Sequence, residues 1–469
     1  MFIFSDDFYA LLPYTPKTLH WNLKSIADYF EPEWNNIVKY DRTSFIEIKR
    51  LDVWQYITSV DEKKYICGCW KHIDDKIKYT TCNIEEFKKE FFSIMDYYLS
   101  LIHARYKQIS ISISGGLDSN TIAAEYSRLY PNDDVHFLTS VISDVTDESK
   151  MAMHMQRVLS NKIDFISIDF GNKDLISSLS EYISNHVPPR FFNLLSEINY
   201  IDHLKKLGNK RIYISGMEAD GLLGGFGNEY RYFARECLKK GEYERAKAVF
   251  TSIQVCFLGI TDPKIINVAF LKWCVREKLK EIVKKFSFKR HNKIYEEQKF
   301  LKITLPERES SQIHSHKEAL DYQAFGDGAL HDTNILFEEK GLSCVYPYGG
   351  YKFLELSAHC DPFIFSNQVN KWCLRKTTEQ LLPKEIINNV VKSGQPGLTL
   401  TKILQENDNT EIIVDYLNRH SNSTLVKENE LLKSVLSSRF GNKEFCALAL
   451  IMFEDQIRNK YGKNIDYFR

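Results

Sequence analysis

The residues best suited to chemistry form the run Ser114-Gly115-Gly116-Leu117-Asp118-Ser119. Its two glycines permit backbone conformations in which successive amide groups point into one concave nest that receives phosphate oxygens. The serines add hydroxyl donors, and a helix beginning here would aim its positive end at the same place. Asp118 would repel phosphate unless a cation such as Mg²⁺ lay between them. The run therefore predicts a phosphate-binding loop; the alternative is a tight strand-to-helix turn that binds nothing.

The segments around this run alternate between strand and helix patterns. Strands are expected over 108–113, 135–142, 164–169 and 211–214, and helices over 120–129, 147–159, 175–183 and 194–207. This order is typical of a parallel, doubly wound α/β sheet. Such sheets bind ligands at the carboxyl ends of their strands. A second glycine-rich run follows the strand at 211–214, so we expect both glycine-rich loops to face one crevice.

A chain of 469 residues is longer than one core usually organises, and we expect three units. Residues 1–95 are predicted to form a small β-rich domain, with strands over 44–48, 54–57, 64–67 and 76–79. A helix over 84–106 leads into a second domain at 96–400, which becomes mostly helical beyond residue 230 and includes a long amphipathic helix over 262–285. Residues 401–469 are expected to form a helical extension. The basic stretch 278–293 is interpreted as a solvated helix face; the less favoured alternative is a binding surface for an acidic peptide.

Composition removes several classes of function. The 62 basic and 62 acidic side chains balance, which argues against a nucleic-acid partner. No apolar stretch approaches membrane-spanning length and the N-terminus lacks a signal-peptide pattern, so we expect a cytoplasmic protein without a membrane partner. The ten cysteines are mostly isolated, which is typical of free thiols.

The run at 114–119 resembles the pyrophosphate-binding loop of the PP-loop ATP pyrophosphatases, in particular the synthetase domain of asparagine synthetases. Further segments resemble that family in the same order over about residues 96–400: the acidic helix start at 147–149, the run 215–225, Pro347-Tyr348, Lys371-Trp372-Cys373-Leu374-Arg375 and Lys392-Ser393-Gly394. The resemblance implies an adenine nucleotide alpha hydrolase-like fold. It also implies that ATP, with Mg²⁺, is split between its α and β phosphates while a carboxylate becomes an acyl-adenylate.

The resemblance also assigns roles to individual residues. Ser114, Gly115, Gly116, Leu117, Asp118, Ser119 and Gly216 would line the nucleotide site. Asp220 matches a second Mg²⁺ ligand beside Asp118. Lys371 would contact pyrophosphate, and Lys392 would stabilise the oxyanion formed when an amine attacks the adenylate. Glu218 is a candidate for relaying the proton of that amine.

Three departures from the family concern the amine. Residue 2 is Phe where glutamine-dependent members carry a catalytic Cys, so residues 1–95 are interpreted as a truncated glutaminase-like remnant. Met217 and Ser343 replace acidic residues that face the acyl acceptor in the relatives. These departures resemble the lasso-peptide cyclases and β-lactam synthetases, in which an internal amine replaces ammonia.

The expected substrate is therefore a small molecule or peptide that carries both a carboxylate and an amine. A protease that processes a precursor peptide is the implied partner. Two alternatives stay open: an ammonia-dependent asparagine synthetase-like enzyme, and a non-catalytic nucleotide-binding partner.

Overall fold

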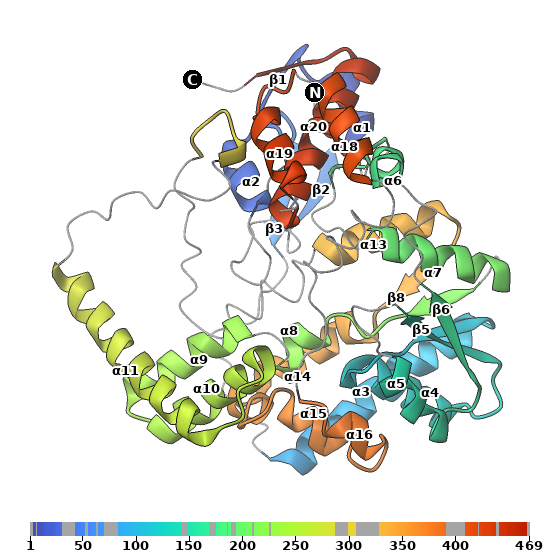
Figure 1. The fold of residues 1–469 in the computed structure, drawn as a ribbon. Coiled ribbons are helices and arrows are strands. Elements are labelled where there is room, and N and C mark those ends of the chain that lie inside the picture. The colour runs from blue at the N-terminus through green and yellow to red at the C-terminus, as the bar shows by residue number, and fades with distance from the viewer. Residues whose placement is uncertain are drawn as a thin grey trace.

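The computed structural model places a parallel sheet beside two groups of helices (Figure 1). It describes residues 3–5, 7–30, 43–51, 55–61, 64–69, 83–141, 149–167, 175–184, 186–188, 194–208, 211–224, 227–286, 299–305, 328–390, 409–420, 422–437 and 440–466.

The central sheet has five strands in the order β6-β5-β4-β7-β8, and all neighbouring pairs are parallel. They are β4 (Ile109–Ser112), β5 (Val135–Val141), β6 (Ile163–Ser167), β7 (Ile212–Ile214) and β8 (Ser343–Val345). The α/β prediction is confirmed. The chain moves outward from β4 to β5 and β6, then returns to the other side of β4 for β7. The strand order therefore reverses beside β4, where open α/β sheets bind their ligands.

Side chains on successive strand residues enter different cores, so the strands carry apolar residues on both faces of the sheet. Phe137, Ile212 and Ile214 belong to one buried cluster, with α3 (Ile84–Arg105) and α4 (Leu117–Leu129). Leu138 and Tyr213 belong to the other cluster, with α6 (Leu175–Ile183), α7 (Leu194–Leu207) and α13 (Gly328–Glu339). Helices thus cover both faces, as a doubly wound sheet requires.

Further helices extend the sheet unit beyond the strands (Figure 1). They are α5 (Ser149–His154), α8 (Ala219–Leu223), α9 (Gly227–Lys240), α10 (Tyr243–Leu258), α11 (Pro263–Phe286), α14 (Tyr351–His359), α15 (Trp372–Thr377) and α16 (Lys384–Ile387). Helix α11 confirms the helix expected over 262–285. The amphipathic pattern is not confirmed, because aliphatic side chains such as Leu271 and Val275 are exposed on the side of the helix that faces solvent.

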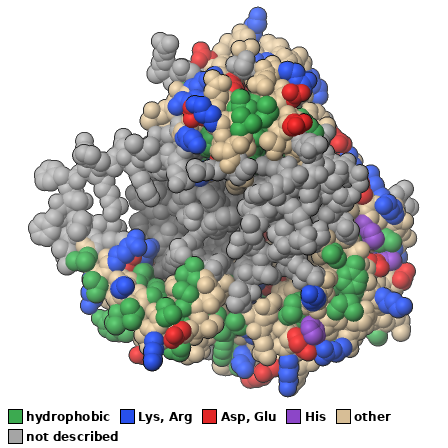
Figure 2. Space-filling view, in the orientation of Figure 1, with side chains coloured by type: hydrophobic (Ala, Val, Ile, Leu, Met, Phe, Trp, Pro, Cys, Tyr) green, Lys and Arg blue, Asp and Glu red, His purple; other side chains and the backbone are tan. Residues whose placement is uncertain are grey.

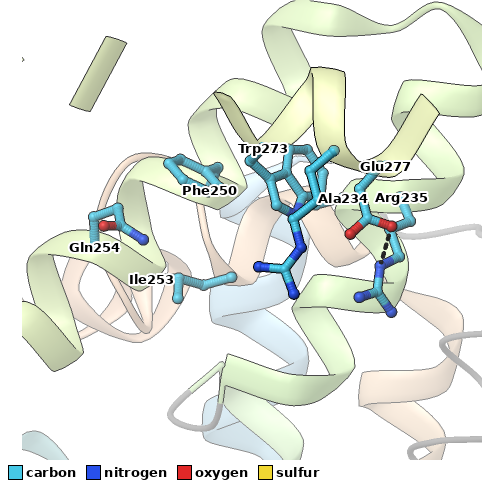
Figure 3. Close-up of a pocket in the computed structure, with 8 residues that line it drawn as sticks. Ala234, Arg235, Phe250, Ile253, Gln254, Trp273 and Glu277 are labelled. Carbon is cyan, nitrogen blue, oxygen red and sulfur yellow. Dashed lines mark ion pairs between the residues drawn. The ribbon is translucent and has the colours of Figure 1, made fainter. Parts of the chain in front are cut away.

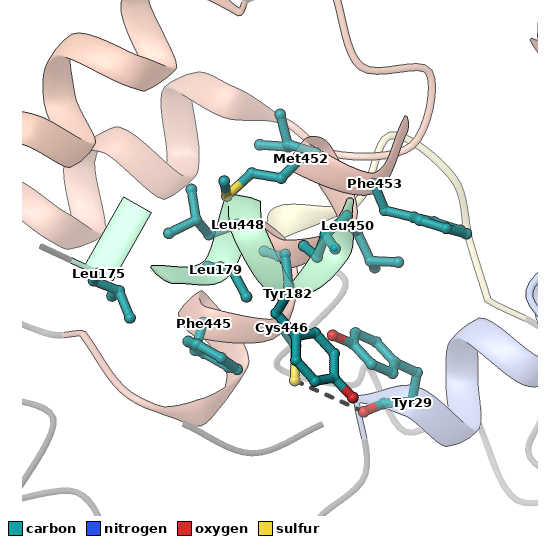
Figure 4. Packing of buried hydrophobic residues seen from close by; sticks show 14 of the residues in the cluster. Tyr29, Leu175, Leu179, Tyr182, Phe445, Cys446, Leu448, Leu450, Met452 and Phe453 are labelled. Atoms are coloured by element: carbon teal, nitrogen blue, oxygen red, sulfur yellow. Dashed lines mark hydrogen bonds between the residues drawn. The ribbon is translucent and has the colours of Figure 1, made fainter. Parts of the chain in front are cut away.

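The two ends of the chain pack against each other. Strand β1 (Thr18–His20) pairs in parallel with β9 (Asn464–Asp466), and the indole of Trp21 donates to Thr424 Oγ1 over 3.0 Å. Helices α1 (Phe8–Leu11) and α2 (Leu23–Tyr29) lie beside α18 (Asn409–Arg419), α19 (Glu428–Leu436) and α20 (Asn442–Tyr461). Figure 4 shows Cys446 of α20 directed at the Tyr29 carbonyl. Residues from both ends therefore contribute to one core; the division at residues 95 and 400 stays a prediction.

The first expected strand, over 44–48, is wrong. The Thr43 hydroxyl donates to the carbonyl of Ile48 and accepts from the Phe45 amide over 3.2 Å, which closes the segment into a turn. Two other expected strands are found as β2 (Gln55–Asp61) and β3 (Lys64–Cys69), an antiparallel pair, and the fourth lies outside the described residues. Seven described cysteines form no disulfide: Cys237, Cys256, Cys274, Cys344, Cys360, Cys373 and Cys446. None of the described helices is long and apolar enough to cross a membrane.

Candidate active site at the carboxyl ends of strands β4 and β7

The loop after β4 is held in shape by one buried asparagine. Asn120, in the first turn of α4, donates to the carbonyls of Ser114 and Gly116, each over 2.7 Å. The Ser114 hydroxyl lies 3.0 Å from that of Ser119 and accepts from the Gly116 amide over 3.1 Å. Helix α4 begins at Leu117, three residues before its predicted start at 120, with Gly116 as its extended N-cap. The first helical turn therefore stands directly at this loop, with its positive end toward it.

Three residues that the sequence placed in one site come together at the strand ends. The Lys371 ammonium, just before α15, forms ion pairs with Asp118 of α4 and with Asp220 of α8; the Lys371 Nζ to Asp220 Oδ1 distance is 2.5 Å. Lys371 is only 5% exposed. Its backbone has φ 53°, a left-handed conformation that is uncommon outside glycine.

The electrostatics of the trio are set by burial and by charge. Burial alone would lower the pKa of Lys371, but the charges of Asp118 and Asp220 and their hydrogen bonds outweigh it and raise the pKa above its usual range. Lys371 therefore stays an ammonium at neutral pH. Two carboxylates from different strand ends thus face one positive charge in a partly shielded place.

The turn after β8 forms the wall behind these carboxylates. Tyr348 is fully buried, and its hydroxyl donates to the Asp118 carbonyl over 3.3 Å. Glu218 is buried with a left-handed backbone, φ 75°, and a methyl group on Gly349 would lie 3.7 Å from Glu218 Cγ. Glu218 therefore packs against this turn, and its role as a proton relay stays a prediction.

A buried arginine fixes the segment that precedes Lys392. Arg375 donates to the carbonyls of Ile387, Asn389 (3.0 Å) and Asn370 (2.8 Å), and to the Asn370 side chain (3.0 Å). Asn389 in turn donates to the carbonyl of Gly115 over 2.9 Å, so this segment reaches the loop at 114–119. Lys392 itself lies outside the described residues.

Residues that hold the site in shape gave weaker sequence signals than the charged ones. Asn120, Tyr348 and Asn389 stand within or beside the motifs, but nothing in their spacing indicates a hydrogen bond to a distant backbone carbonyl. The one available signal for Asn120 is a polar side chain in the first turn of a helix whose other residues are mostly buried.

The chemistry of Asp118 and Asp220 fits Mg²⁺. Both carboxylates already contact a cation, the Lys371 ammonium. Within the described part of the chain, no group of three or more His, Cys, Asp or Glu side chains could hold a metal ion. Mg²⁺ typically takes one or two protein carboxylates and completes its shell with waters and substrate phosphates. Two aspartates beside the glycine-containing loop at 114–119 fit this arrangement.

A separate pocket lies among the helices α9, α10 and α11. It has a volume of about 280 Å³ and is lined by Ala234, Arg235, Phe250, Ile253, Gln254, Trp273, Arg276 and Glu277. Figure 3 shows Arg235 paired with Glu277 across its wall, with a 3.2 Å contact. None of the predicted site residues lines this pocket, so it is distinct from the site at the strand ends.

The parallel sheet, with a glycine-containing loop and two carboxylates at the carboxyl ends of its strands, places this chain among the doubly wound α/β proteins, which bind ligands where the strand order reverses. The family model for asparagine synthase matches residues 106–447 of this chain. The match covers more than half of the chain, so the protein belongs to the asparagine synthase family and is a ligase. A comparison with curated protein sequences found no match.

Proposed function

We propose that this ligase uses ATP to activate a carboxylate as an acyl-adenylate and then forms an amide bond, with AMP and pyrophosphate as products. The convergence of Asp118, Asp220 and Lys371 beside the loop at 114–119 carries the proposal. The loop has no Gly-Lys-Ser/Thr sequence, so it does not suggest transfer of the γ-phosphate.

In this proposal Asp118 and Asp220 would hold Mg²⁺ on the β and γ phosphates, where the ion would neutralise the charge that develops as pyrophosphate leaves. Amides and hydroxyls of the loop would bind the phosphates. The Lys371 ammonium, released from the carboxylates by the incoming cation, would follow the departing pyrophosphate. The buried setting strengthens each of these charge interactions relative to water.

The reaction balances in two steps. An oxygen of the substrate carboxylate attacks the α-phosphorus of ATP, which breaks the bond to the β-phosphate oxygen and releases pyrophosphate. The amine nitrogen then attacks the acyl carbon, loses a proton and displaces AMP. Lys392 would stabilise the tetrahedral oxyanion, and Glu218 would accept the proton of the amine.

We further propose that the amine belongs to the same substrate molecule, as in lasso-peptide macrolactam formation. Phe2, Met217 and Ser343 support this reading, because each replaces a residue that the glutamine-dependent relatives use to supply or receive ammonia. A substrate that carries both groups avoids a bimolecular encounter. A peptide substrate implies a protease that prepares it, and the use of ATP and Mg²⁺ is in keeping with the expected cytoplasmic location.

Exchange of labelled pyrophosphate into ATP tests the adenylation step. Peptides with an N-terminal amine and an Asp or Glu side chain should support exchange by the wild-type protein, and product should appear with the loss of one water mass. Asp118→Asn and Asp220→Asn should abolish exchange. Asp133→Asn removes a carboxylate that pairs with His103 over 2.8 Å and precedes the amino end of β5, away from the carboxyl ends where the site lies, so exchange should be unchanged. Normal exchange by Asp118→Asn would show that Asp118 does not take part in the adenylation step.

A further inference from the structure

Helix α11 presents a second apolar face besides the one that packs into the protein. On its inner side Phe270 and Trp273 lie against Phe250 of α10, with ring centroids 5.5 and 5.4 Å apart. On its outer side five aliphatic side chains are exposed. They are Ile265 (54%), Val268 (53%), Leu271 (64%), Val275 (59%) and Leu279 (54%).

These five residues lie along one line of the helix and are named here the α11 stripe. Successive members are three or four residues apart, the spacing of one helix face. At 1.5 Å per residue the stripe is about 21 Å long. A contiguous run of large aliphatic side chains on a surface marks an interaction site more often than a scattered one does.

Positive charge accompanies the α11 stripe. Lys264 and Lys272 are exposed and, at about 100° per residue, project within about 40° of the centre of the stripe. Lys278 is exposed about 80° from that centre, and its ammonium lies 3.5 Å from the Tyr243 hydroxyl. The sequence from residue 263 to 279 contains a single acidic residue, Glu277, and this side chain is paired with Arg235. Figure 2 shows hydrophobic side chains gathered on the part of the surface where α11 lies, with Lys and Arg beside them.

The side chains of the α11 stripe and the lysines beside it indicate which kind of partner this surface fits. A second copy of this chain would bring the lysines of one stripe against those of the other, which is repulsive. Protein interfaces favour aromatic side chains and Arg and are poor in Lys, whereas the stripe is wholly aliphatic and its flanking cations include three lysines. Helix α11 also lies at the edge of the molecule (Figure 1). Aliphatic side chains with lysines on an edge helix suit the headgroup and acyl boundary of an anionic bilayer.

We propose that the α11 stripe docks this protein on an anionic membrane surface. The aliphatic side chains enter the boundary between headgroups and acyl chains, and Lys264, Lys272 and Lys278 bind lipid phosphates or carboxylates. This contact is peripheral and independent of the proposed reaction. It differs from the expectation of no membrane partner, because the zero net charge of the whole chain conceals a local basic, apolar face.

Vesicle co-sedimentation of the full chain tests the proposal. The protein should bind vesicles of phosphatidylcholine with 30% phosphatidylserine, but not phosphatidylcholine alone, and 0.5 M NaCl should release it. Leu271→Ser with Val275→Ser should weaken binding by at least about tenfold. Replacing Lys264, Lys272 and Lys278 with Gln should weaken it as well. Leu436→Ser is the matched control, because Leu436 on α19 is equally exposed at 62% and should have no effect.

Three outcomes would overturn the proposal. One is absence of binding to the anionic vesicles by wild-type protein with a normal thermal transition. Another is unchanged binding by both the stripe and the lysine variants. The third is a wild-type protein that light scattering shows to be a dimer, together with a Leu271→Ser, Val275→Ser variant that is a monomer. That result would show that the α11 stripe contacts a second copy of the chain.

Discussion

Gly216 lies against the backbone of Ser119, so that a methyl group at Gly216 would be 2.5 Å from the Ser119 amide nitrogen and 2.8 Å from its Cα. The contact joins the loop after β7 to the first turn of α4. Asp118 directly precedes Ser119 in α4, and Asp220 follows Gly216 by four residues, in α8. The separation of the two carboxylates therefore depends on the absence of a side chain at residue 216.

The first prediction follows from this contact. Gly216→Ala should force the two loops apart, because backbone atoms at 2.5 Å cannot yield as a flexible side chain would. We expect a loss of about 1–3 kcal/mol in stability and a fall of about a hundredfold in ATP–pyrophosphate exchange, in line with a displacement of about 1 Å at a reaction centre.

A matched variant controls for the general effect of replacing glycine in this crevice. At Gly349 an added methyl group would meet its nearest neighbour, Tyr346 Cβ, at an ordinary 3.6 Å. Gly349→Ala should therefore change unfolding temperature and exchange only slightly. Equal effects of the two variants would show that the contact between Gly216 and Ser119 does not set the geometry of the site.

The second prediction concerns the charge on Lys371. Lys371→Met leaves Asp118 and Asp220 facing each other without their shared cation, so we expect a loss of about 3–5 kcal/mol in stability. Added MgCl₂ should raise the unfolding temperature of the variant more than that of the wild type, because Mg²⁺ would restore a positive charge between the carboxylates.

Thermal unfolding with and without 10 mM MgCl₂ measures this difference. Lys340→Met is the control, since Lys340 pairs with Glu181 over 2.7 Å in a solvent-accessible position and such pairs contribute about 0–1 kcal/mol. The same response to MgCl₂ in wild type, Lys371→Met and Lys340→Met would argue against a metal site at these two aspartates.

The positions of the charged residues after the strands explain how much of the site could be predicted from the sequence. Asp118 and Asp220 each follow a predicted strand, and parallel neighbouring strands end at the same edge. The order of motifs then pointed to Lys371, and the structure brings the three together. Their catalytic roles stay predictions.

Short elements and long-range hydrogen bonds could not be predicted in the same way. Strand β8 has three residues, Ser343-Cys344-Val345, too few for any periodicity, and it is defined by its pairing with β7. Arg375 belongs to a motif that the sequence shows, but the motif does not indicate which four acceptors its guanidinium reaches, because these are set by the folded structure. The turn at Thr43 shows the converse, because a local side-chain hydrogen bond overrode an alternating pattern.

The third prediction concerns Arg375. Arg375→Lys keeps the charge but loses the planar fork that reaches Asn370, Ile387 and Asn389 together. We expect a loss of about 2–3 kcal/mol in stability, because several partly buried carbonyls lose their donor. Exchange should fall mainly through its maximal rate, with a smaller change in the KM for ATP, since Asn389 also contacts Gly115.

The same substitution at Arg419 provides the comparison. Arg419 donates to the Asp415 carbonyl over 3.2 Å on the surface of α18, so Arg419→Lys should have little effect on stability or exchange. If Arg375→Lys unfolds at the same temperature as the wild type, the network around Arg375 contributes less than its geometry indicates.

The last prediction is a pH dependence of stability that originates at Glu197. This residue of α7 is shielded from solvent at Oε2, which has no hydrogen-bond partner among the described residues. Burial raises the pKa of its carboxyl from 4.5 to about 7. The folded chain therefore binds a proton that the unfolded chain releases between these two values, so this group makes stability fall as pH rises from 4.5 to 7.

Glu197→Gln removes this ionisation while keeping the shape of the side chain. The variant should gain stability relative to the wild type as pH rises from 5 to 8, by at most about 3 kcal/mol, and the two proteins should converge toward pH 4.5. Urea unfolding at several pH values measures the difference. Because burial of the charge is the cause, the gain must persist in 0.5 M NaCl, where surface interactions are screened. A difference that is constant with pH would show that Glu197 titrates alike in the folded and unfolded chain.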